Sequence, residues 1–275
     1  MKKFEDILIL SDLDGTFLSK NTGEVSRNID KIKYFTENGG HFSFATGRVA
    51  PHVLFAAPNS PNYVNCPIVS ANGMVIYDIV SGKALIENFT DSDMIAKMLS
   101  LINEKYPNVL FRAMNGKGVV TFQPENSFMK REMERGDCPV SVITRENWIN
   151  EKFYKVTLRD EHETLLEVSK VIEKSFPDEF NLCFSWPTIF EIMPKGMSKA
   201  VAALRLRDML SVDGVKKKLY AVGDYGNDIE MLKAADVAVC PSNAIDEVKA
   251  VCDLCLCDND SGVIADLIEH IENNL

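Results

Sequence analysis

The sequence lacks a long apolar run. Its first apolar stretch, Ile7–Leu10, is too short for the core of an export signal and ends before Asp12. No window approaches the roughly 18 uncharged apolar residues that a membrane-spanning helix requires. We therefore expect a soluble, cytoplasmic protein with no membrane partner.

Positive charge is also scarce. Lys and Arg total 30 against 40 Asp and Glu, which gives a formal net charge of -10. A surface with this balance does not favour binding to a polyanion, so nucleic acid is not an expected partner. Low-complexity tracts and internal repeats are absent as well, which excludes a collagenous, disordered or repeat architecture.

The seven cysteines are an odd number in a chain with no recognisable export signal. Reduced thiols are therefore expected, rather than a disulfide scaffold. Cys252, Cys255 and Cys257 form a C-x-x-C-x-C string that suggests a metal site. The run from 251 to 257 also alternates as a strand does, and this alternation favours small buried side chains over metal ligands.

What the sequence does have is enough apolar material for two cores. The chain is 275 residues long and 46% hydrophobic, so two domains are expected. Short apolar runs end in polar loops and alternate with segments of helical periodicity, which predicts a doubly wound α/β domain with a parallel sheet. The predicted strands are residues 7–10, 42–45, 67–69, 219–222 and 237–239.

The spacing of apolar residues is different in the middle of the chain. Its pattern predicts two helices, a hairpin around residues 115–118 and further strands, which is typical of an α+β domain. The simplest organisation is a discontinuous core at residues 1–84 and 190–275, with a second domain inserted at residues 85–189.

Acidic side chains follow two of the predicted core strands. Asp12 and Asp14 follow the first strand, and Asp224 and Asp228 follow a later one. Ligands of such sheets bind beyond the carboxyl ends of the strands, so these four carboxylates are expected to converge. Converging carboxylates repel each other, and a hard divalent cation such as Mg2+ relieves that repulsion. Turn chemistry alone explains an Asp-x-Asp-Gly string. It does not explain that string directly after a strand together with a Gly-Asp-x-x-Asn-Asp string after a later strand and a Thr-Gly pair between them.

Four ordered strings of this chain resemble the motifs of the haloacid dehalogenase-like hydrolases, and more narrowly of the Cof-type sugar phosphatases. They are Asp12-Leu13-Asp14-Gly15-Thr16, Ala45-Thr46-Gly47-Arg48, Lys195-Gly196-Met197-Ser198-Lys199 and Gly223-Asp224-Tyr225-Gly226-Asn227-Asp228. The resemblance implies a doubly wound, Rossmann-like core with a large inserted α+β cap. It also implies a Mg2+-dependent phosphatase that acts on small phosphorylated metabolites, sugar phosphates first among them.

The resemblance implies that Asp12 is the nucleophile and forms an aspartyl-phosphate. Asp14 would first protonate the departing oxygen and then deprotonate the attacking water. An acid at the position of Asp14 is typical of the phosphatases of this family, rather than of its dehalogenases or ion pumps. The implied metal ligands are the Asp12 side chain, the Asp14 backbone carbonyl and Asp224, with Asp228 as a ligand or a support.

The transferring phosphoryl group would be held by neutral donors and one cation. The implied donors are the Thr46 hydroxyl, the Gly47 and Leu13 amides, and the Asn227 side chain. Lys199 would be the fixed cation. Its rival is Lys195, four residues earlier, but Lys199 follows Ser198 at the expected start of a helix.

Several alternatives stay open at this level. Asn72 is predicted to contact phosphate or substrate, although an Asn-Gly pair also suits a simple turn. A phosphosugar mutase would use the same Asp12 and Asp14, and a phosphometabolite sensor that has lost turnover would keep the same fold. The expected oligomeric state is a monomer or a homodimer, and the sequence selects no specific substrate.

Overall fold

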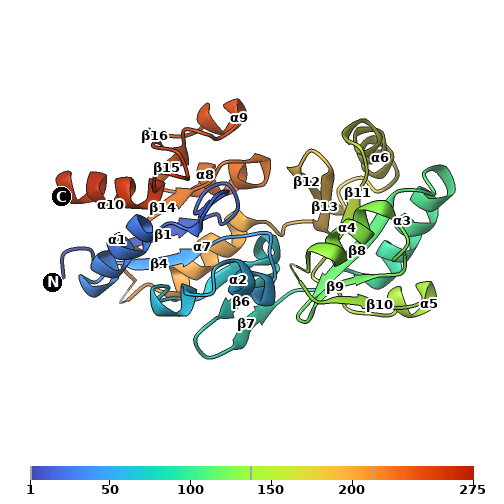
Figure 1. Cartoon of the computed structure of the whole chain (residues 1–275), viewed down its shortest axis with the longest axis horizontal. Coiled ribbons are helices and arrows are strands. Elements are labelled where there is room, and N and C mark those ends of the chain that lie inside the picture. Colours follow the sequence, from blue (N-terminus) through green and yellow to red (C-terminus); the bar gives the residue numbers. More distant parts are fainter. Residues whose placement is uncertain (1, 137, 213) are drawn as a thin grey trace. The chain divides into compact units, whose positions relative to one another are not determined.

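The computed structural model describes residues 2–136, 138–212 and 214–275 (Figure 1). The chain divides into two compact units. The core unit comprises Met1–Gly47, Ala56–Ile86 and Ser198–Leu275, and the inserted unit comprises Arg48–Phe55 and Glu87–Met197. The predicted division placed residues 48–55 and 190–197 in the core, whereas in the structure these segments pack with the inserted unit.

The centre of the core unit is a five-stranded sheet in which every pairing is parallel. All five residues of the interior strand β1 (Ile7–Ser11) are buried, because the sheet is covered on both faces. This arrangement confirms the predicted α/β fold. In spatial order the strands are β16 (Leu254–Leu256), β15 (Val237–Pro241), β14 (Lys218–Val222), β1 (Ile7–Ser11) and β4 (His41–Phe44).

Helices pack on both faces of this sheet (Figure 1). Leu8 and Leu10 of β1 point to one face, into a cluster with Ala203, Leu206 and Met231. Those three residues come from α7 (Lys199–Met209) and α8 (Ile229–Ala234). On the other face α1 (Ser26–Glu37) and α10 (Val263–Asn273) pack against each other. The alternation of side chains along each strand thus supplies both faces of the sheet.

Smaller elements complete the core unit. A parallel bridge between Ala45 and Val69 attaches a second sheet of order β5-β6-β7 to the edge at β4. The additional elements are β5 (Ile68–Ser70), β6 (Val75–Asp78), β7 (Lys83–Glu87), β2 (Leu18–Ser19), β3 (Gly23–Glu24), α9 (Asp246–Lys249) and the 3-10 turns η1 (Ser60–Asn62), η2 (Ala71–Gly73) and η3 (Gly226–Asp228).

The inserted unit is built on a six-stranded mixed sheet. In spatial order its strands are β10 (Val140–Val142), β9 (Gly118–Thr121), β8 (Leu110–Asn115), β11 (Lys155–Arg159), β13 (Ile189–Pro194) and β12 (Phe180–Trp186). The predicted hairpin is present, with Asn115 paired to Gly118 across its turn. The middle segment is therefore α+β, as predicted.

Two helices cover one face of that sheet. The apolar residues of α3 (Ser92–Lys105) and α6 (His162–Ser175) form a cluster with sheet residues such as Phe111 and Val156. Three shorter helices were not predicted, because each is too short or too polar to give a clear apolar period. These are α2 (Ala50–Ala56), α4 (Ser127–Arg135) and α5 (Arg145–Trp148).

The C-x-x-C-x-C segment contains a strand, as its alternation indicated, but the prediction of buried side chains was wrong: Cys255 is exposed, and Cys252 and Cys257 are only partly buried. Cys255 lies within β16 and pairs with Cys240 of β15. The group of side chains close enough together to hold a metal ion, within the described part of the chain, contains no cysteine. Among the described residues, no helix combines the length and apolarity needed to cross a bilayer.

Candidate active site

Two neighbouring strands of the core sheet end side by side. Ser11, the last residue of β1, pairs in parallel register with Val222, the last residue of β14. The chain continues from these residues into the two acidic loops, and the Asp12 amide donates to the Val222 carbonyl at 2.8 Å. Parallel register therefore brings Asp12 and Asp224 together although 212 positions separate them in the sequence.

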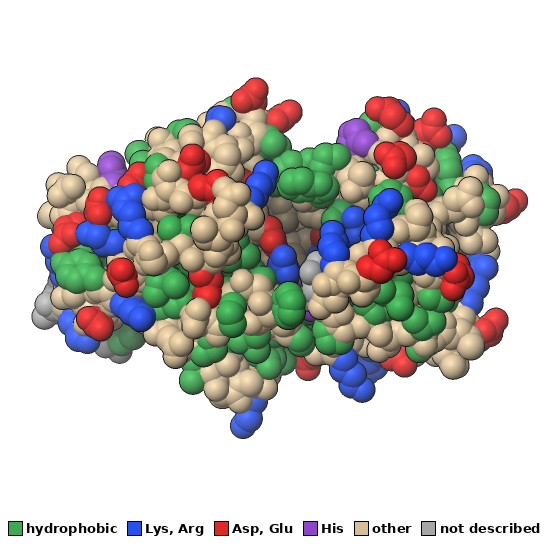
Figure 2. All heavy atoms as spheres, viewed as in Figure 1, with side chains coloured by type: hydrophobic (Ala, Val, Ile, Leu, Met, Phe, Trp, Pro, Cys, Tyr) green, Lys and Arg blue, Asp and Glu red, His purple; other side chains and the backbone are tan. Residues whose placement is uncertain are grey.

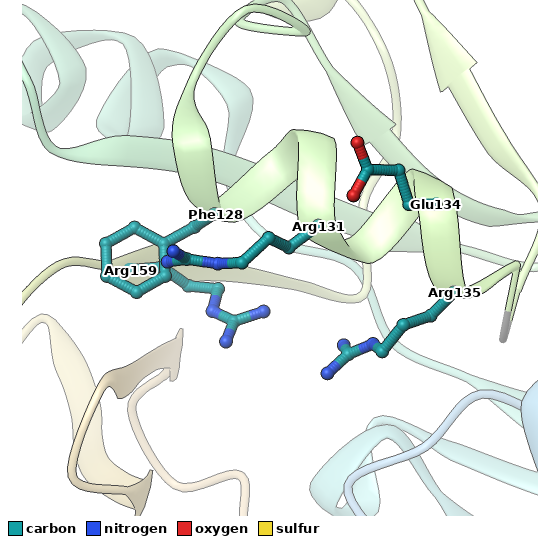
Figure 3. Close-up of a pocket in the computed structure, with 5 residues that line it drawn as sticks. All are labelled: Phe128, Arg131, Glu134, Arg135 and Arg159. Carbon is teal, nitrogen blue, oxygen red and sulfur yellow. The ribbon is translucent and has the colours of Figure 1, made fainter.

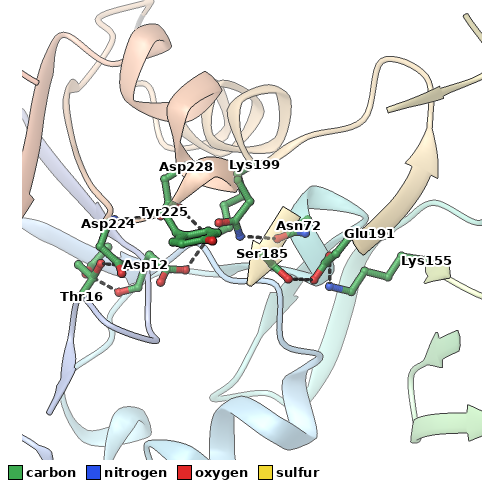
Figure 4. A network of polar contacts seen from close by, with 12 residues as sticks. Asp12, Thr16, Asn72, Lys155, Ser185, Glu191, Lys199, Asp224, Tyr225 and Asp228 are labelled. Atoms are coloured by element: carbon green, nitrogen blue, oxygen red, sulfur yellow. Dashed lines mark hydrogen bonds and ion pairs between the residues drawn. The ribbon is translucent and has the colours of Figure 1, made fainter. Parts of the chain in front are cut away.

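Three carboxylates meet where these loops converge. Asp12, Asp224 and Asp228 each offer an oxygen within 4.8 Å of the others, and all three residues are buried (Figure 4). Burial of several like charges is costly unless a cation or a proton compensates them.

The side chain of Asp224 is fixed from the first loop. The Thr16 hydroxyl donates to Asp224 Oδ1 at 2.8 Å. Gly15 makes this approach possible, because a β-carbon there would lie 2.4 Å from Asp224 Oδ2. Gly15 also has φ of +80°, a conformation that side chains with a β-carbon rarely adopt. The Gly-Thr pair thus sets the position of a carboxylate in the other loop.

Asp228 is held by its own loop. Its Oδ2 accepts hydrogen bonds from the backbone amides of Asp224 at 3.0 Å and Tyr225 at 3.2 Å. Its Oδ1 accepts from Lys199 Nζ at 2.7 Å (Figure 4). Asp228 therefore links the loop after β14 to the start of α7.

Lys199 is the cation of the cluster. It is buried at the first position of α7, and Ser198 caps that helix by accepting from the amide of Val201. Its Nζ lies 2.5 Å from Asp12 Oδ1, so it pairs with Asp12 as well as Asp228. Lys195 instead belongs to the inserted unit, where its exposed side chain pairs with Asp178.

Burial and neighbouring carboxylates shift the pKa values of this cluster. Burial raises the pKa of Asp12 well above its usual value, against the opposing effect of Lys199, and the neighbouring carboxylates raise it further. Burial and the charge of Asp228 raise the pKa of Asp224 to about 7. Burial lowers the pKa of Lys199, but Asp12 and Asp228 outweigh this and raise it overall.

A divalent cation fits this donor set. The cluster offers three buried carboxylates and one ammonium group, and hard cations prefer carboxylate oxygens. A divalent cation near Asp12 and Asp224 would offset the repulsion between the carboxylates, which adds to the effect of burial on both pKa values.

A third loop, which follows β4, carries Thr46 and lies next to the segment that follows β5. The Thr46 amide donates to the Val69 carbonyl at 2.9 Å, and the Thr46 carbonyl accepts from the Asn72 amide at 2.9 Å. Asn72 is buried with φ of 55°, and its side-chain oxygen accepts from Asn227 at 3.5 Å. The structure thus brings Asn72 and Asn227 together. The backbone of Thr46 is hydrogen-bonded to the segment that contains Asn72, and Gly47 follows Thr46 in the chain.

A model of the haloacid dehalogenase-like hydrolase family matches residues 9–268. The chain belongs to the haloacid dehalogenase-like hydrolases. This match confirms the resemblance that the four motifs indicated.

The hydrolase is similar to named relatives over almost its full length. It is 26% identical over 264 residues to the 5-amino-6-(5-phospho-D-ribitylamino)uracil phosphatase YcsE of Bacillus subtilis. The matched region covers 96% of this chain and 94% of the relative. The predicted enzyme class, a phosphatase of this family, is confirmed at that level.

Two solved structures share the fold. A HAD/COF-like hydrolase from Plasmodium vivax superposes with a TM-score of 0.85 at 23% identity, over 99% of this chain and 98% of that one. The HAD subclass IIB sugar phosphatase BT4131 superposes with a TM-score of 0.82 at 20% identity, over 96% and 98%. At these identities the likeness bears on the fold alone.

Leu13 and Asp14 continue the first loop directly after Asp12. The side chain of Asp14 is exposed, and its negative charge contributes to raising the pKa values of Asp12 and Asp224. Leu13 is fully buried, and its carbonyl accepts from the Leu18 amide at 2.9 Å. The first loop therefore turns back directly after the two acidic positions.

Thr16 is the site residue to which the sequence analysis assigned no role. Its hydroxyl contacts Asp224 in a loop 208 positions away, and no local pattern indicates that contact. The available signal was its place at the end of the Asp-Leu-Asp-Gly-Thr string.

Proposed function

We propose that this hydrolase is a Mg2+-dependent phosphatase that removes phosphate from small phosphorylated metabolites, with sugar phosphates as the first candidates. One observation carries the proposal: Asp12 lies at the end of β1 within a buried group of two further carboxylates and Lys199. This arrangement suits a carboxylate nucleophile that attacks a doubly charged phosphate.

The first step transfers the phosphoryl group to Asp12. A carboxylate oxygen of Asp12 attacks phosphorus, the bond from phosphorus to the ester oxygen breaks, and an aspartyl-phosphate forms. The exposed Asp14 donates a proton to the departing oxygen, which leaves as an alcohol. The acid lies two positions after the nucleophile in the same loop, which allows both to reach the same reacting centre.

The second step returns Asp12 to its starting state. Asp14, now ionised, accepts a proton from a water molecule as that water attacks phosphorus. The bond from phosphorus to Asp12 breaks, and inorganic phosphate leaves. Asp14 thus gives up a proton in the first step and regains one in the second, so it is ready for the next substrate molecule.

Asp12, Asp224 and Asp228, with the Asp14 backbone carbonyl, are the residues that would hold Mg2+. When bound, the ion would offset the charge of the nucleophile and the phosphate. Lys199 supplies a second, permanent positive charge at the Asp12 carboxylate. Thr46, Asn72 and Asn227, with the Gly47 and Leu13 amides, would donate hydrogen bonds to the phosphoryl oxygens.

The substrate class is supported by the name of a similar protein. One relative, at 26% identity, is named for a phosphatase of a phosphorylated ribitylamino compound. That name describes a compact molecule that carries a phosphate ester. The net charge of -10 disfavours a nucleic acid substrate.

The test is release of inorganic phosphate from an aryl phosphate and a panel of sugar phosphates, with Mg2+ or a chelator. Wild type is compared with Asp12→Asn, which keeps the shape of the side chain and removes its charge. Asp30→Asn is the matched control, because Asp30 is exposed on α1. We expect turnover to require both Mg2+ and Asp12. The Asp30→Asn variant should turn over substrate at the wild-type rate.

Other outcomes would contradict the proposal. An isomerised sugar phosphate with little free phosphate would identify a mutase. Tight ligand binding without turnover at saturating Mg2+ would identify a sensor. Equal turnover by wild type and Asp12→Asn would assign the nucleophile to another residue.

A further inference from the structure

One face of α4 in the inserted unit carries a stripe of cationic and aromatic side chains. Phe128, Arg131 and Arg135 are spaced three and four residues apart, so they lie on the same side of the helix. Arg159, at the end of β11, lies against this stripe. With Glu134 these residues line a pocket of about 340 Å3 (Figure 3).

The arginines converge on one side of the helix. Figure 3 shows the guanidinium groups of Arg131, Arg135 and Arg159 on the same side of α4, while the Glu134 carboxylate points away from them. In Figure 2, blue side chains gather on the visible face of the inserted unit where Figure 1 labels α4. The pocket lining has three positive charges and one negative charge, a net charge of +2, in a protein whose net charge is -10.

The ring of Phe128 positions two of these groups. The guanidinium carbons of Arg131 and Arg159 lie 4.7 Å and 5.4 Å from its centroid. A cation-π contact uses the flat face of a guanidinium group and leaves its N–H donors at the edge. Stacking on the ring therefore orients both arginines without occupying their hydrogen-bonding capacity.

Hydrogen-bonding capacity remains open at the pocket. Arg159 donates through one terminal nitrogen to Glu132 at 3.0 Å, but its buried Nε has no hydrogen-bond partner within the described part of the chain. Glu132 also pairs with Arg112, so this carboxylate is shared between two guanidinium groups. Among described residues, no carboxylate lies at ion-pair distance from Arg131. A bound phosphate oxygen that reaches this donor would supply the missing hydrogen bond.

We propose that the pocket of Phe128, Arg131, Arg135 and Arg159 binds a phosphate group of a small phosphorylated molecule. The three guanidinium groups of the lining suit an anion, and the planar fork of a guanidinium group matches two oxygens of a phosphate group. None of these residues belongs to the carboxylate cluster of the core unit.

Side-chain NMR of the full chain tests this site directly, with inorganic phosphate as the probe. The Nε–H resonances of the arginines are recorded in Asp12→Asn with a chelator present, so the test does not depend on phosphatase activity. Assignments come from Arg131→Gln and Arg159→Gln. We expect the Arg131 and Arg159 resonances to shift and to saturate as phosphate is raised through the millimolar range.

The matched pair of variants is Arg131→Gln and Arg145→Gln. Arg145 is exposed in the same unit but does not line the pocket. Arg131→Gln removes one charge-assisted contact and is expected to raise the Kd for phosphate about tenfold, as measured from the Arg159 resonance. The Arg145→Gln substitution should leave the affinity unchanged. An Arg159 resonance that does not move, or that moves equally with chloride at the same ionic strength, would overturn the proposal.

Kinetics separates two sources of the phosphate group, and this comparison rests on the proposed function. If Arg131→Gln raises KM for a sugar bisphosphate but not for a sugar monophosphate, the pocket binds a second phosphate of the substrate. If neither KM changes while the resonances shift, it binds a separate phosphorylated molecule. Both results support the site, and the NMR result stands even if the phosphatase proposal fails.

Discussion

The ammonium group of Lys199 lies 2.5 Å from the carboxylate of Asp12, a residue 187 positions earlier in the chain. The ion pair is buried on both sides. It joins the start of α7 to the end of β1, and Asp228 joins the same ammonium group from a third segment. The charge balance of the site therefore depends on one lysine.

Substitution of Lys199 by Met should destabilise the protein strongly. The substitution leaves Asp12 and Asp228 buried without their cation, and breaking a buried pair from one side costs about 3–5 kcal/mol. Chemical denaturation with a chelator present measures this loss. Lys195→Met is the control, because Lys195 is exposed and pairs with Asp178 at the surface. Equal stability of the two variants would contradict the prediction.

Substitution of Thr16 by Val should weaken metal binding while the fold is kept. Val has nearly the same shape, but it cannot donate to Asp224 Oδ1, so the carboxylate loses the contact that orients it. Loss of such a supporting contact typically costs about 10–100-fold in metal affinity. The Mg2+ concentration for half-maximal phosphate release measures it. Thr22→Val, at an exposed threonine in the same unit, should leave that concentration unchanged.

Gly15 and Gly23 form a matched pair for the packing of the acidic loop. Both have positive φ, but a β-carbon at Gly15 would meet Asp224, whereas one at Gly23 would meet nothing within 4 Å. Each substitution by Ala costs about 1 kcal/mol from backbone strain. Gly15→Ala should in addition lose most activity, because Asp224 must move. The two variants are compared by thermal unfolding and phosphate release, and similar activity would exclude the clash.

His52 should make stability depend on pH. Burial, with the positive charges of Arg48 and Arg112 and against the opposing charge of Glu132, lowers the pKa of His52 to about 4. As the pH falls below about 6.5, His52 binds a proton in the unfolded state but not in the folded state. The contribution of His52 to the unfolding free energy is therefore fully present above about pH 6.5 and is lost as the pH falls from about 6.5 to about 4.

The His52 effect is measured as a difference between variants. From pH 7 to pH 5, wild type should lose about 2 kcal/mol of unfolding free energy more than His52→Gln does. Urea denaturation at the two pH values gives this number. His162→Gln, at an exposed histidine of the same unit, should follow wild type. A His52→Gln variant with the full pH dependence would assign the effect to other groups.

The buried pair of Lys155 and Glu191 should show strong coupling. Lys155 donates to Glu191, which also accepts from Ser185 at 2.7 Å (Figure 4). Burial lowers the pKa of Lys155 against the effect of Glu191. Lys155→Met alone should cost about 3–5 kcal/mol, and adding Glu191→Leu should recover most of it, because no unpaired charge remains. A double-mutant cycle measures the coupling, and additive losses would contradict it.

Much of the core could be predicted from the sequence because its signals are local. Short apolar runs that end in acidic loops identified β1 and β14, and Ser198 marked the start of the helix that carries Lys199. The inserted unit was predicted less completely, because α4 is short and largely polar and gives no clear apolar period.

The sequence by itself determined the order of the strands and helices, the acidic loops and the family, since these depend on residue type and spacing along the chain. Tertiary structure alone decided that Thr16 holds Asp224, that Lys199 joins Asp12 to Asp228, and that Arg159 meets the stripe on α4. Those contacts join segments far apart in the sequence. Their geometry depends on sheet register and helix packing, which no local pattern encodes.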